Sequence, residues 1–183
     1  MKKNSSFLKE IKEDCLKISE RDDVGRDWSQ NNYYQGYTSY SSIANLHELN
    51  STFINLRKKI DSQVKKYAKK LGLELSEELQ MQSCWMNIMP PGSSHSLHLH
   101  PLSIISGTVY IDVPKGSGNI KFEDPRLSKM MNCPPRKDAY HSGAFASLKP
   151  VVGDLILFES WLRHEVEINK GKANRISISF NYS

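Results

Sequence analysis

The sequence has few cysteines, no long apolar run and no large excess of charge, and each shortage excludes a class of protein. Its three cysteines, Cys15, Cys84 and Cys133, are widely spaced and lie outside any Cys-x-x-Cys pattern. This pattern predicts neither a disulfide framework nor a zinc ribbon and favours a reducing compartment. No apolar run approaches the roughly 18 to 20 residues of a membrane span, and no secretion signal follows the polar start. We therefore expect a cytoplasmic protein without a membrane partner.

The charge balance gives little support to nucleic acid as a partner. Lys and Arg exceed Asp and Glu by 25 to 20, and much of the excess lies in residues 57–70. The basic residues there are interleaved with apolar residues at helical spacing, which is typical of the solvated face of a surface helix. With 38% hydrophobic and 25% charged residues, the 183-residue chain has the composition of one folded domain rather than of a disordered chain.

The periodicity of apolar residues divides the chain into helices followed by strands. Residues 6–20 and 43–71 show helical spacing, Gly72 is a natural helix stop, and residues 22–42 suit an irregular segment whose aromatic residues pack against a folded body. Short alternating or β-branched runs then occupy residues 80–89, 103–113, 119–123, 151–158 and 175–182. We expect a jelly-roll core over residues 80–183, with residues 1–79 forming a helical and irregular segment packed on one sheet.

Three of the six histidines, His98, His100 and His164, are candidates for a metal site. His95, His98 and His100 lie close together, and His164 follows a predicted strand through a short turn. On an extended chain His98 and His100 share one face while His95 points the other way. With His164 they make three ligands, the number with which a catalytic transition metal keeps open positions for substrate and oxygen. An isolated His-x-His is a weak signal, so an ordinary hydrogen-bonded pair stays open. Because imidazole binds metal only when neutral, affinity should fall below about pH 6.5.

The last strand carries an arginine at its start. On a strand over residues 175–181, Arg175 and Ser177 share a polar face with Ser179 and Asn181, and the other face is apolar. If the polar face points into the barrel, the buried guanidinium needs an anion, and its planar fork matches a carboxylate. If the strand is an outer one, the polar face is simply solvated.

Several of these segments together resemble the 2-oxoglutarate and Fe(II)-dependent oxygenases of bacteria and their phages. The resemblance is strong over residues 80–183 and looser over 33–42 and the helix after it. It is carried by Trp85-Met86-Asn87, His98-Leu99-His100-Pro101, Ser106-Gly107-Thr108-Val109-Tyr110, Asp124-Pro125-Arg126, Ser160-Trp161-Leu162-Arg163-His164 and Arg175-Ile176-Ser177-Ile178-Ser179-Phe180-Asn181.

The resemblance implies a mainly β fold, a double-stranded β-helix (jelly roll, cupin-like) with N-terminal helices packed against one sheet. It implies Fe(II) held by His98, His100 and His164, with His100 where the wider superfamily has a carboxylate. Arg175 would pair with the far carboxylate of 2-oxoglutarate beside Ser177. The reaction implied uses O2 and couples decarboxylation of 2-oxoglutarate to hydroxylation of a small-molecule or peptidyl substrate that the sequence does not identify.

Other side chains near these motifs have more than one reading. Asn87 and Tyr110 are further candidates for contacts to 2-oxoglutarate, although Tyr110 could instead be a core aromatic whose hydroxyl bonds the backbone. Asp124 and Arg126 suit an ion pair in a turn. Trp85 and Trp161 suit packing. His95 and His141 suit the surface, and residues 134–145 could form part of a lid.

Three alternatives from other classes stay open. One is a three-histidine iron dioxygenase, resembling the thiol dioxygenases, that does not use 2-oxoglutarate; Arg175 argues against it. The second is a non-catalytic jelly roll that binds a metal or a small molecule. The third is a protein-interaction module that works through the basic residues 58–70.

Overall fold

The computed structural model describes residues 5–126, 131, 132, 134 and 143–183. The helices are α1 (Ser6–Arg21), α2 (Asp23–Asn32), α3 (Leu46–Leu49) and α4 (Ser51–Leu71). The strands are β1 (Tyr37–Thr38), β2 (Met81–Met89), β3 (His95–His98), β4 (Ile105–Asp112), β5 (Ile120–Glu123), β6 (Phe145–Leu148), β7 (Leu155–Glu159), β8 (His164–Val166) and β9 (Arg175–Tyr182).

The helical part of the chain agrees with the sequence at its ends and differs in the middle. Helix α1 is confirmed, and α4 stops at Gly72, whose positive φ of 70° suits glycine. The single helix expected over 43–71 is wrong, because the chain is extended at Asn50, whose side chain caps α4 by accepting from the Phe53 amide at 3.1 Å.

The irregular segment expected over 22–42 is also wrong, since it contains α2 and β1. Asp22 caps α2 by accepting a hydrogen bond from the Gly25 amide at 3.0 Å. Few residues of α2 are apolar, so the helical spacing on which the prediction relied is weak there.

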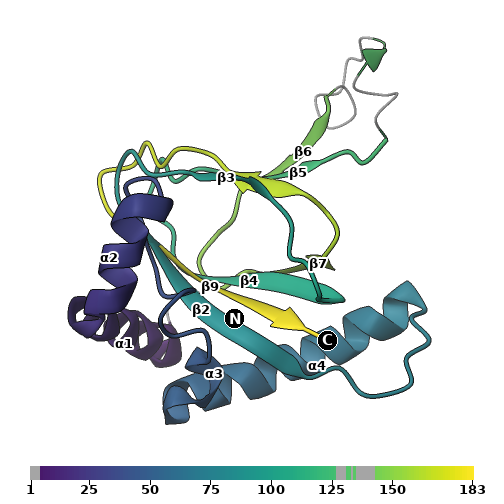
Figure 1. Cartoon of the computed structure of the whole chain (residues 1–183), viewed down its shortest axis with the longest axis horizontal. Coiled ribbons are helices and arrows are strands. Elements are labelled where there is room, and N and C mark those ends of the chain that lie inside the picture. The colour runs from purple at the N-terminus through teal and green to yellow at the C-terminus, as the bar shows by residue number, and fades with distance from the viewer. Residues whose placement is uncertain (1–4, 127–130, 133, 135–142) are drawn as a thin grey trace.

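Among the described residues the strands form two antiparallel sheets. The major sheet has the order β1-β2-β9-β4-β7 and the minor sheet the order β3-β8-β5-β6. The two sheets face each other, while α1, α3 and α4 cover the outer face of the major sheet (Figure 1). This is the double-stranded β-helix with helices on one sheet that the sequence predicts. Strands β1, β3, β6 and β8 are additional to those predicted from apolar runs.

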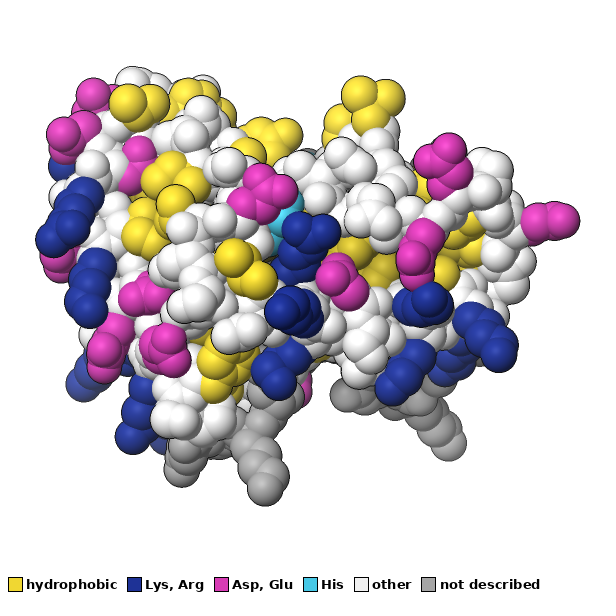
Figure 2. Space-filling model, turned by 90° about the horizontal axis from the view of Figure 1, so that it is seen from below, with side chains coloured by type: hydrophobic (Ala, Val, Ile, Leu, Met, Phe, Trp, Pro, Cys, Tyr) yellow, Lys and Arg dark blue, Asp and Glu magenta, His cyan; other side chains and the backbone are white. Residues whose placement is uncertain are grey.

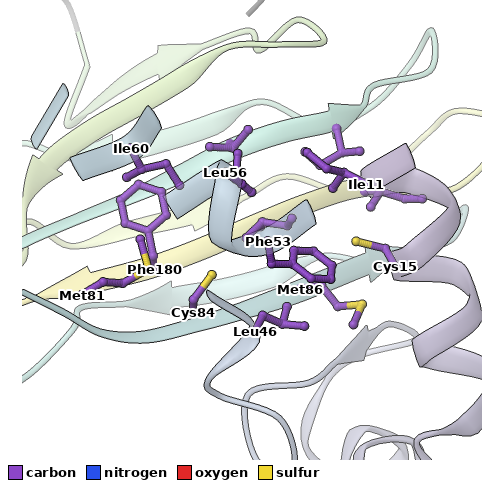
Figure 3. Packing of buried hydrophobic residues seen from close by; sticks show 14 of the residues in the cluster. Ile11, Cys15, Leu46, Phe53, Leu56, Ile60, Met81, Cys84, Met86 and Phe180 are labelled. Carbon is purple, nitrogen blue, oxygen red and sulfur yellow. The ribbon is translucent and has the colours of Figure 1, made fainter. Parts of the chain in front are cut away.

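The main core lies between the helices and the major sheet. Side chains of α1, α3 and α4, among them Ile11, Leu46 and Phe53, pack against Met86 of β2 and Phe180 of β9 (Figure 3). Ile176 and Ile178 of β9 belong to the same cluster. Because β9 alternates and runs between β2 and β4, its opposite face must point between the sheets.

All eight residues of β9 are buried. The outer-strand reading, in which its polar face is solvated, is therefore wrong. The polar face that begins with Arg175 points into the barrel, as the resemblance implies.

The basic helix α4 has a mixed, solvated surface. The face seen from below shows Lys and Arg side chains interleaved with Asp and Glu (Figure 2). Lys65 pairs with Glu78 at 2.7 Å and Arg57 with Asp61 at 3.7 Å. Among the described residues, no helix has both the length and the apolar character that crossing a bilayer requires.

Candidate metal centre and adjoining polar pocket

Strand pairing brings two of the predicted histidines together. His98 at the end of β3 lies directly opposite His164 at the start of β8, and their ring centroids are 4.2 Å apart. The two residues are far apart in sequence, so only the antiparallel pairing of the minor sheet places them side by side. His164 is buried, and His98 is partly buried at the mouth of the barrel.

His100 completes the cluster from the segment after β3. Its amide donates to the Ser160 carbonyl at 3.1 Å, and its ring centroid lies 5.3 Å from that of His98 and 5.1 Å from that of His164. One ligand atom from each of the three rings lies within 4.8 Å of the others. Within the part of the chain that the structure describes, this group contains no carboxylate.

Hydrogen bonds fix which nitrogen of each ring is free. The Nδ1 atom of His98 lies 2.7 Å from the Ser96 carbonyl, and that of His164 lies 3.0 Å from the Leu162 carbonyl. A carbonyl can only accept, so Nδ1 carries the proton and Nε2 keeps its lone pair. The Nδ1 of His100 likewise donates to Oδ1 of Asn181 at 2.6 Å. Holding Nδ1 in this way orients a histidine for metal binding through Nε2.

Burial keeps these imidazoles neutral. It lowers the pKa of His164 to about 3 and that of His100 to about 4, and it also lowers the pKa of His98. The neighbouring rings add to the effect at His164 and His100, since two positive imidazolium groups would repel each other. Neutral imidazole is the form that binds a metal, so the site stays competent well below pH 6.5.

The alternation of an ideal strand predicts that His95 points away from the other histidines, but in the structure it lies against them. Its ring stacks on that of His98, with centroids 4.1 Å apart, and meets the ring of Tyr33 edge-on at 4.8 Å. The register between β3 and β8 shifts between His95 and His98, which breaks the period of two. Burial lowers its pKa to about 3. The expectation of an ordinary surface residue is therefore wrong.

A row of polar side chains crosses the inner face of the major sheet beside the histidines. Asn87 of β2 and Tyr110 of β4 lie opposite Ser177 of β9 from its two sides. Arg175, two residues earlier on the same face, is 2% exposed. Its guanidinium lies 5.0 Å from the Tyr110 ring centroid, and Nη1 contacts Sδ of Met89 at 3.0 Å.

Several buried polar atoms in this place have no hydrogen-bond partner. They are the Nε of Arg175, the hydroxyls of Tyr110 and Tyr33, and Oδ1 of Asn87, and all four residues line one pocket. The backbone-bonded hydroxyl considered for Tyr110 is thus wrong. Within the described residues Arg175 has no ionic partner. Buried polar groups are normally satisfied, so this concentration indicates a polar, anionic ligand.

Tyr33 is a site residue that the sequence does not reveal. It lies in a segment whose aromatic residues read as packing, and no motif marks it. Burial raises the pKa of its hydroxyl above the ordinary value, with Arg175 acting in the opposite direction. Burial likewise raises the pKa of Tyr110. Both hydroxyls therefore stay protonated at neutral pH and can donate to a carboxylate.

Two adjacent cavities with shared lining residues lie in this region. The inner one has a volume of about 30 Å³ and holds the polar row and the histidines. The outer one has a volume of about 240 Å³. Tyr33, Trp85, His95, His98 and His100 line both.

The remaining predicted residues have simpler positions. Arg126 pairs with Asp124 at 2.7 Å, which confirms the ion pair in a turn. Trp85 is buried, but Trp161 is 53% exposed, so the packing role expected for Trp161 is wrong. His141 and most of the loop 134–145 considered as a lid lie outside the described residues.

Comparison with known proteins gives one family match. A family model described as "Putative 2OG-Fe(II) oxygenase" matches residues 83–181, more than half of the chain. This stretch contains all of the histidines of the cluster and the polar row from β2, β4 and β9. No curated protein matches the chain in sequence.

Solved structures share the fold at low sequence identity. An oxidoreductase of the 2OG-Fe(II) oxygenase family from Burkholderia pseudomallei has 19% identity and a TM-score of 0.54. The match covers 72% of this chain but 56% of that one, so this chain spans little more than half of its length.

Two other similar structures are matched over more of their length. A prolyl-4-hydroxylase from Pseudomonas putida has 16% identity and a TM-score of 0.62, covering 96% of this chain and 85% of that one. A prolyl hydroxylase from Trichoplax adhaerens, in complex with a peptide fragment of hypoxia inducible factor, has 18% identity and a TM-score of 0.63. That match covers 97% and 78% of the two chains.

Proposed function

The chain belongs to the family of 2OG-Fe(II) oxygenases, and on that premise we propose that it hydroxylates an organic substrate by a reaction coupled to decarboxylation of 2-oxoglutarate. The balanced reaction converts a substrate C–H bond, 2-oxoglutarate and O2 into the C–OH product, succinate and CO2. Fe(II) and 2-oxoglutarate, when bound, supply the oxidising chemistry. The protein's own residues bind these groups, orient them and exclude water.

One observation carries the proposal: three neutral histidines converge beside a buried arginine that has no ionic partner in the described residues. His98, His100 and His164 would hold the metal through Nε2, because Nδ1 of each is already engaged. Three imidazoles leave Fe(II) with its full charge of +2, which a dianionic cosubstrate cancels. The donor set therefore fits both groups.

Arg175 would bind the far carboxylate of 2-oxoglutarate. Its planar fork can form two parallel charge-assisted hydrogen bonds, and Ser177 on the same strand face can donate another. The hydroxyls of Tyr33 and Tyr110 are unpartnered donors in the same pocket. Asn87 donates from Nδ2 to the Ser179 hydroxyl at 3.1 Å, which leaves its Oδ1 as an acceptor for a hydroxyl or a water.

Other features of the chain and of its structural neighbours bear on the class of substrate and on the cellular compartment. The two prolyl hydroxylases among the similar structures support a peptidyl or small-molecule substrate. Two of the basic residues of α4 pair with acidic side chains, Arg57 with Asp61 and Lys65 with Glu78, which argues against nucleic acid as a partner. The buried Cys15 and Cys84 are free, which supports a reducing, cytoplasmic compartment.

The decisive experiment measures iron content and succinate formation on the same preparation. The protein with Fe(II), 2-oxoglutarate and O2 should form succinate slowly even without a substrate, and His164→Ala should lose both metal and turnover. The matched control is His47→Gln, because His47 is a buried histidine outside the cluster. Metal binding without succinate would favour a binding protein. Oxygen consumption that is independent of 2-oxoglutarate would favour the other type of iron dioxygenase.

A further inference from the structure

The outer pocket adjoins the histidine cluster and has a distinct lining. Its walls come from α2, β1, β2, β3 with the segment after it, and the end of β9. The lining residues are Trp28, Asn32, Tyr33, Thr38, Tyr40, Trp85, His95, His98, Leu99, His100, Pro101 and Asn181. None of them is Asp, Glu, Lys or Arg, whereas the inner pocket contains Arg175. The two cavities therefore suit ligands of different charge.

Among the residues that the structure describes, no charged side chain lines this pocket, and this limits what can enter. A charged group that leaves water for this pocket would lose its hydration and find no counter-ion in the walls, which is strongly unfavourable. A cation would also approach a metal centre and Arg175. An anion would bind better in the inner pocket, because that pocket contains Arg175. An uncharged group avoids both penalties.

Aromatic rings provide the contact surface for such a group. The rings of Tyr40 and Trp85 meet edge-on at 5.0 Å, and Trp85 lies 5.6 Å from the ring of His100. Trp28 contributes a further indole. Flat apolar faces bind ring carbons and branched aliphatic carbons well, and they lose little conformational freedom on binding.

The wall that carries these rings is fixed in place before any ligand binds. Asp22 accepts hydrogen bonds from the Tyr37 hydroxyl at 2.7 Å and from the Ser42 hydroxyl at 2.5 Å. The Ser29 hydroxyl accepts from the Thr38 amide at 3.0 Å, which joins α2 to β1. A pre-organised wall reduces the entropy lost on binding and favours selection by shape.

The size of the pocket indicates a group rather than a whole molecule. Its volume of about 240 Å³ lies below the roughly 300–1,000 Å³ of sites that enclose drug-sized ligands. Its rim includes Tyr40, Leu99 and Trp28, which are 50%, 43% and 37% exposed. The rest of a larger molecule can therefore lie outside, across this apolar rim.

We propose that the outer pocket is the substrate site and selects an uncharged ring or branched aliphatic group, held among Trp28, Tyr40 and Trp85 with its C–H bond facing the histidine cluster. This inference rests on the proposed function, because it makes the pocket the substrate side of the metal centre. The group is hydroxylated in the balanced reaction given above.

A matched set of compounds tests the charge selectivity. N-acetyl amino acid amides of leucine, proline and phenylalanine carry uncharged side chains, and those of aspartate and lysine differ from them mainly in charge. Two of the three tryptophans line the pocket, so quenching of tryptophan fluorescence reports binding. The affinity for the uncharged compounds should be at least about tenfold higher than the affinity for the charged ones. The uncharged compounds should also raise succinate formation above the substrate-free rate.

Variants locate the binding site. Trp28→Ala should weaken binding of the uncharged amides about tenfold, whereas Trp161→Ala removes an exposed tryptophan outside the pocket and should not. Asn32→Lys places a cation on the exposed rim at the end of α2. It should strengthen binding of the aspartate amide without strengthening that of the lysine amide.

The outcomes separate the two proposals. Equal binding of charged and uncharged amides by the wild type, or wild-type binding by Trp28→Ala, overturns the inference about the pocket. Absence of succinate from iron-loaded protein with every compound overturns the proposed function, while the fluorescence titrations still decide the selectivity of the pocket.

Discussion

Replacing Arg175 by methionine should stabilise the protein without ligand and abolish its affinity for 2-oxoglutarate. The guanidinium is 2% exposed, lies in the centre of the major sheet and has no ionic partner within the described residues. Its contacts are the Met89 sulfur at 3.0 Å and the face of the Tyr110 ring at 5.0 Å. Methionine keeps much of the volume and removes the charge.

The expected gain in stability follows from the cost of burying a charge. Replacing buried charged groups by apolar residues of similar volume is often neutral or stabilising by about 1–4 kcal/mol. We therefore expect the free energy of unfolding of Arg175→Met to be equal to or higher than that of the wild type. A structural arginine with good partners would instead make the variant less stable by several kcal/mol.

The expected loss in binding is large. Two charge-assisted hydrogen bonds to the far carboxylate contribute about 1.5–3 kcal/mol each, or roughly 3–6 kcal/mol together. At about 1.4 kcal/mol per factor of ten, this is a loss of about 10² to 10⁴ in affinity. Ser177→Ala removes one neutral donor and should cost roughly tenfold or less.

Denaturant titration without ligand and anaerobic calorimetry of 2-oxoglutarate binding to the Fe(II)-loaded protein measure the two effects. Arg175→Lys is the comparison variant, since it keeps the charge but loses the planar fork. The reasoning would be refuted by an Arg175→Met protein that unfolds more easily than the wild type yet binds 2-oxoglutarate within about threefold of it.

Three further predictions follow from the same site. Asn181→Ala, which removes the acceptor for Nδ1 of His100, should weaken metal binding about 10- to 100-fold in a chelator competition, and an unchanged affinity would contradict its orienting role. Burial lowers the pKa of all three imidazoles, to about 3 at His164 and to about 4 at His100, so the metal affinity should begin to decline only below pH 6.5; a decline that has already begun at pH 6.5 argues against the buried, neutral cluster. Asp22→Ala, which leaves the buried Tyr37 hydroxyl without its acceptor, should lower the free energy of unfolding by about 1–3 kcal/mol in denaturant titration, and a neutral effect would mean that water replaces the carboxylate.

Local patterns in the sequence were sufficient for most of the fold. Alternation over β9 predicts both its limits and its two faces, because a strand has a period of two whatever its neighbours are. The apolar stripe of α4 and the left-handed glycine that ends it are equally local. Helix α2 has few apolar residues and escaped prediction, because its helix depends on the Asp22 cap and on packing against β1.

The site likewise contains residues that local sequence patterns predict and one residue that only the fold brings to it. The types and spacing of His98, His100, His164 and Arg175 predict metal and carboxylate chemistry from the sequence. The structure brings one ligand atom from each of the three histidines within 4.8 Å of the others. Tyr33 carries no motif. Only the fold places its unpartnered hydroxyl in the pocket that Arg175 lines.

The position of His95 and the outer pocket could not be predicted from the sequence. A strand pattern puts His95 on the wrong face, because a register shift between two strands depends on a partner some seventy residues away, as in the pairing of His95 with Val166. The uncharged pocket likewise gathers its walls from α2, β1, β2 and β9. The sequence determined which chemical groups are available and how each segment folds locally. Only the tertiary structure decided which of them meet, because strand register and sheet packing are set by contacts between residues distant along the chain.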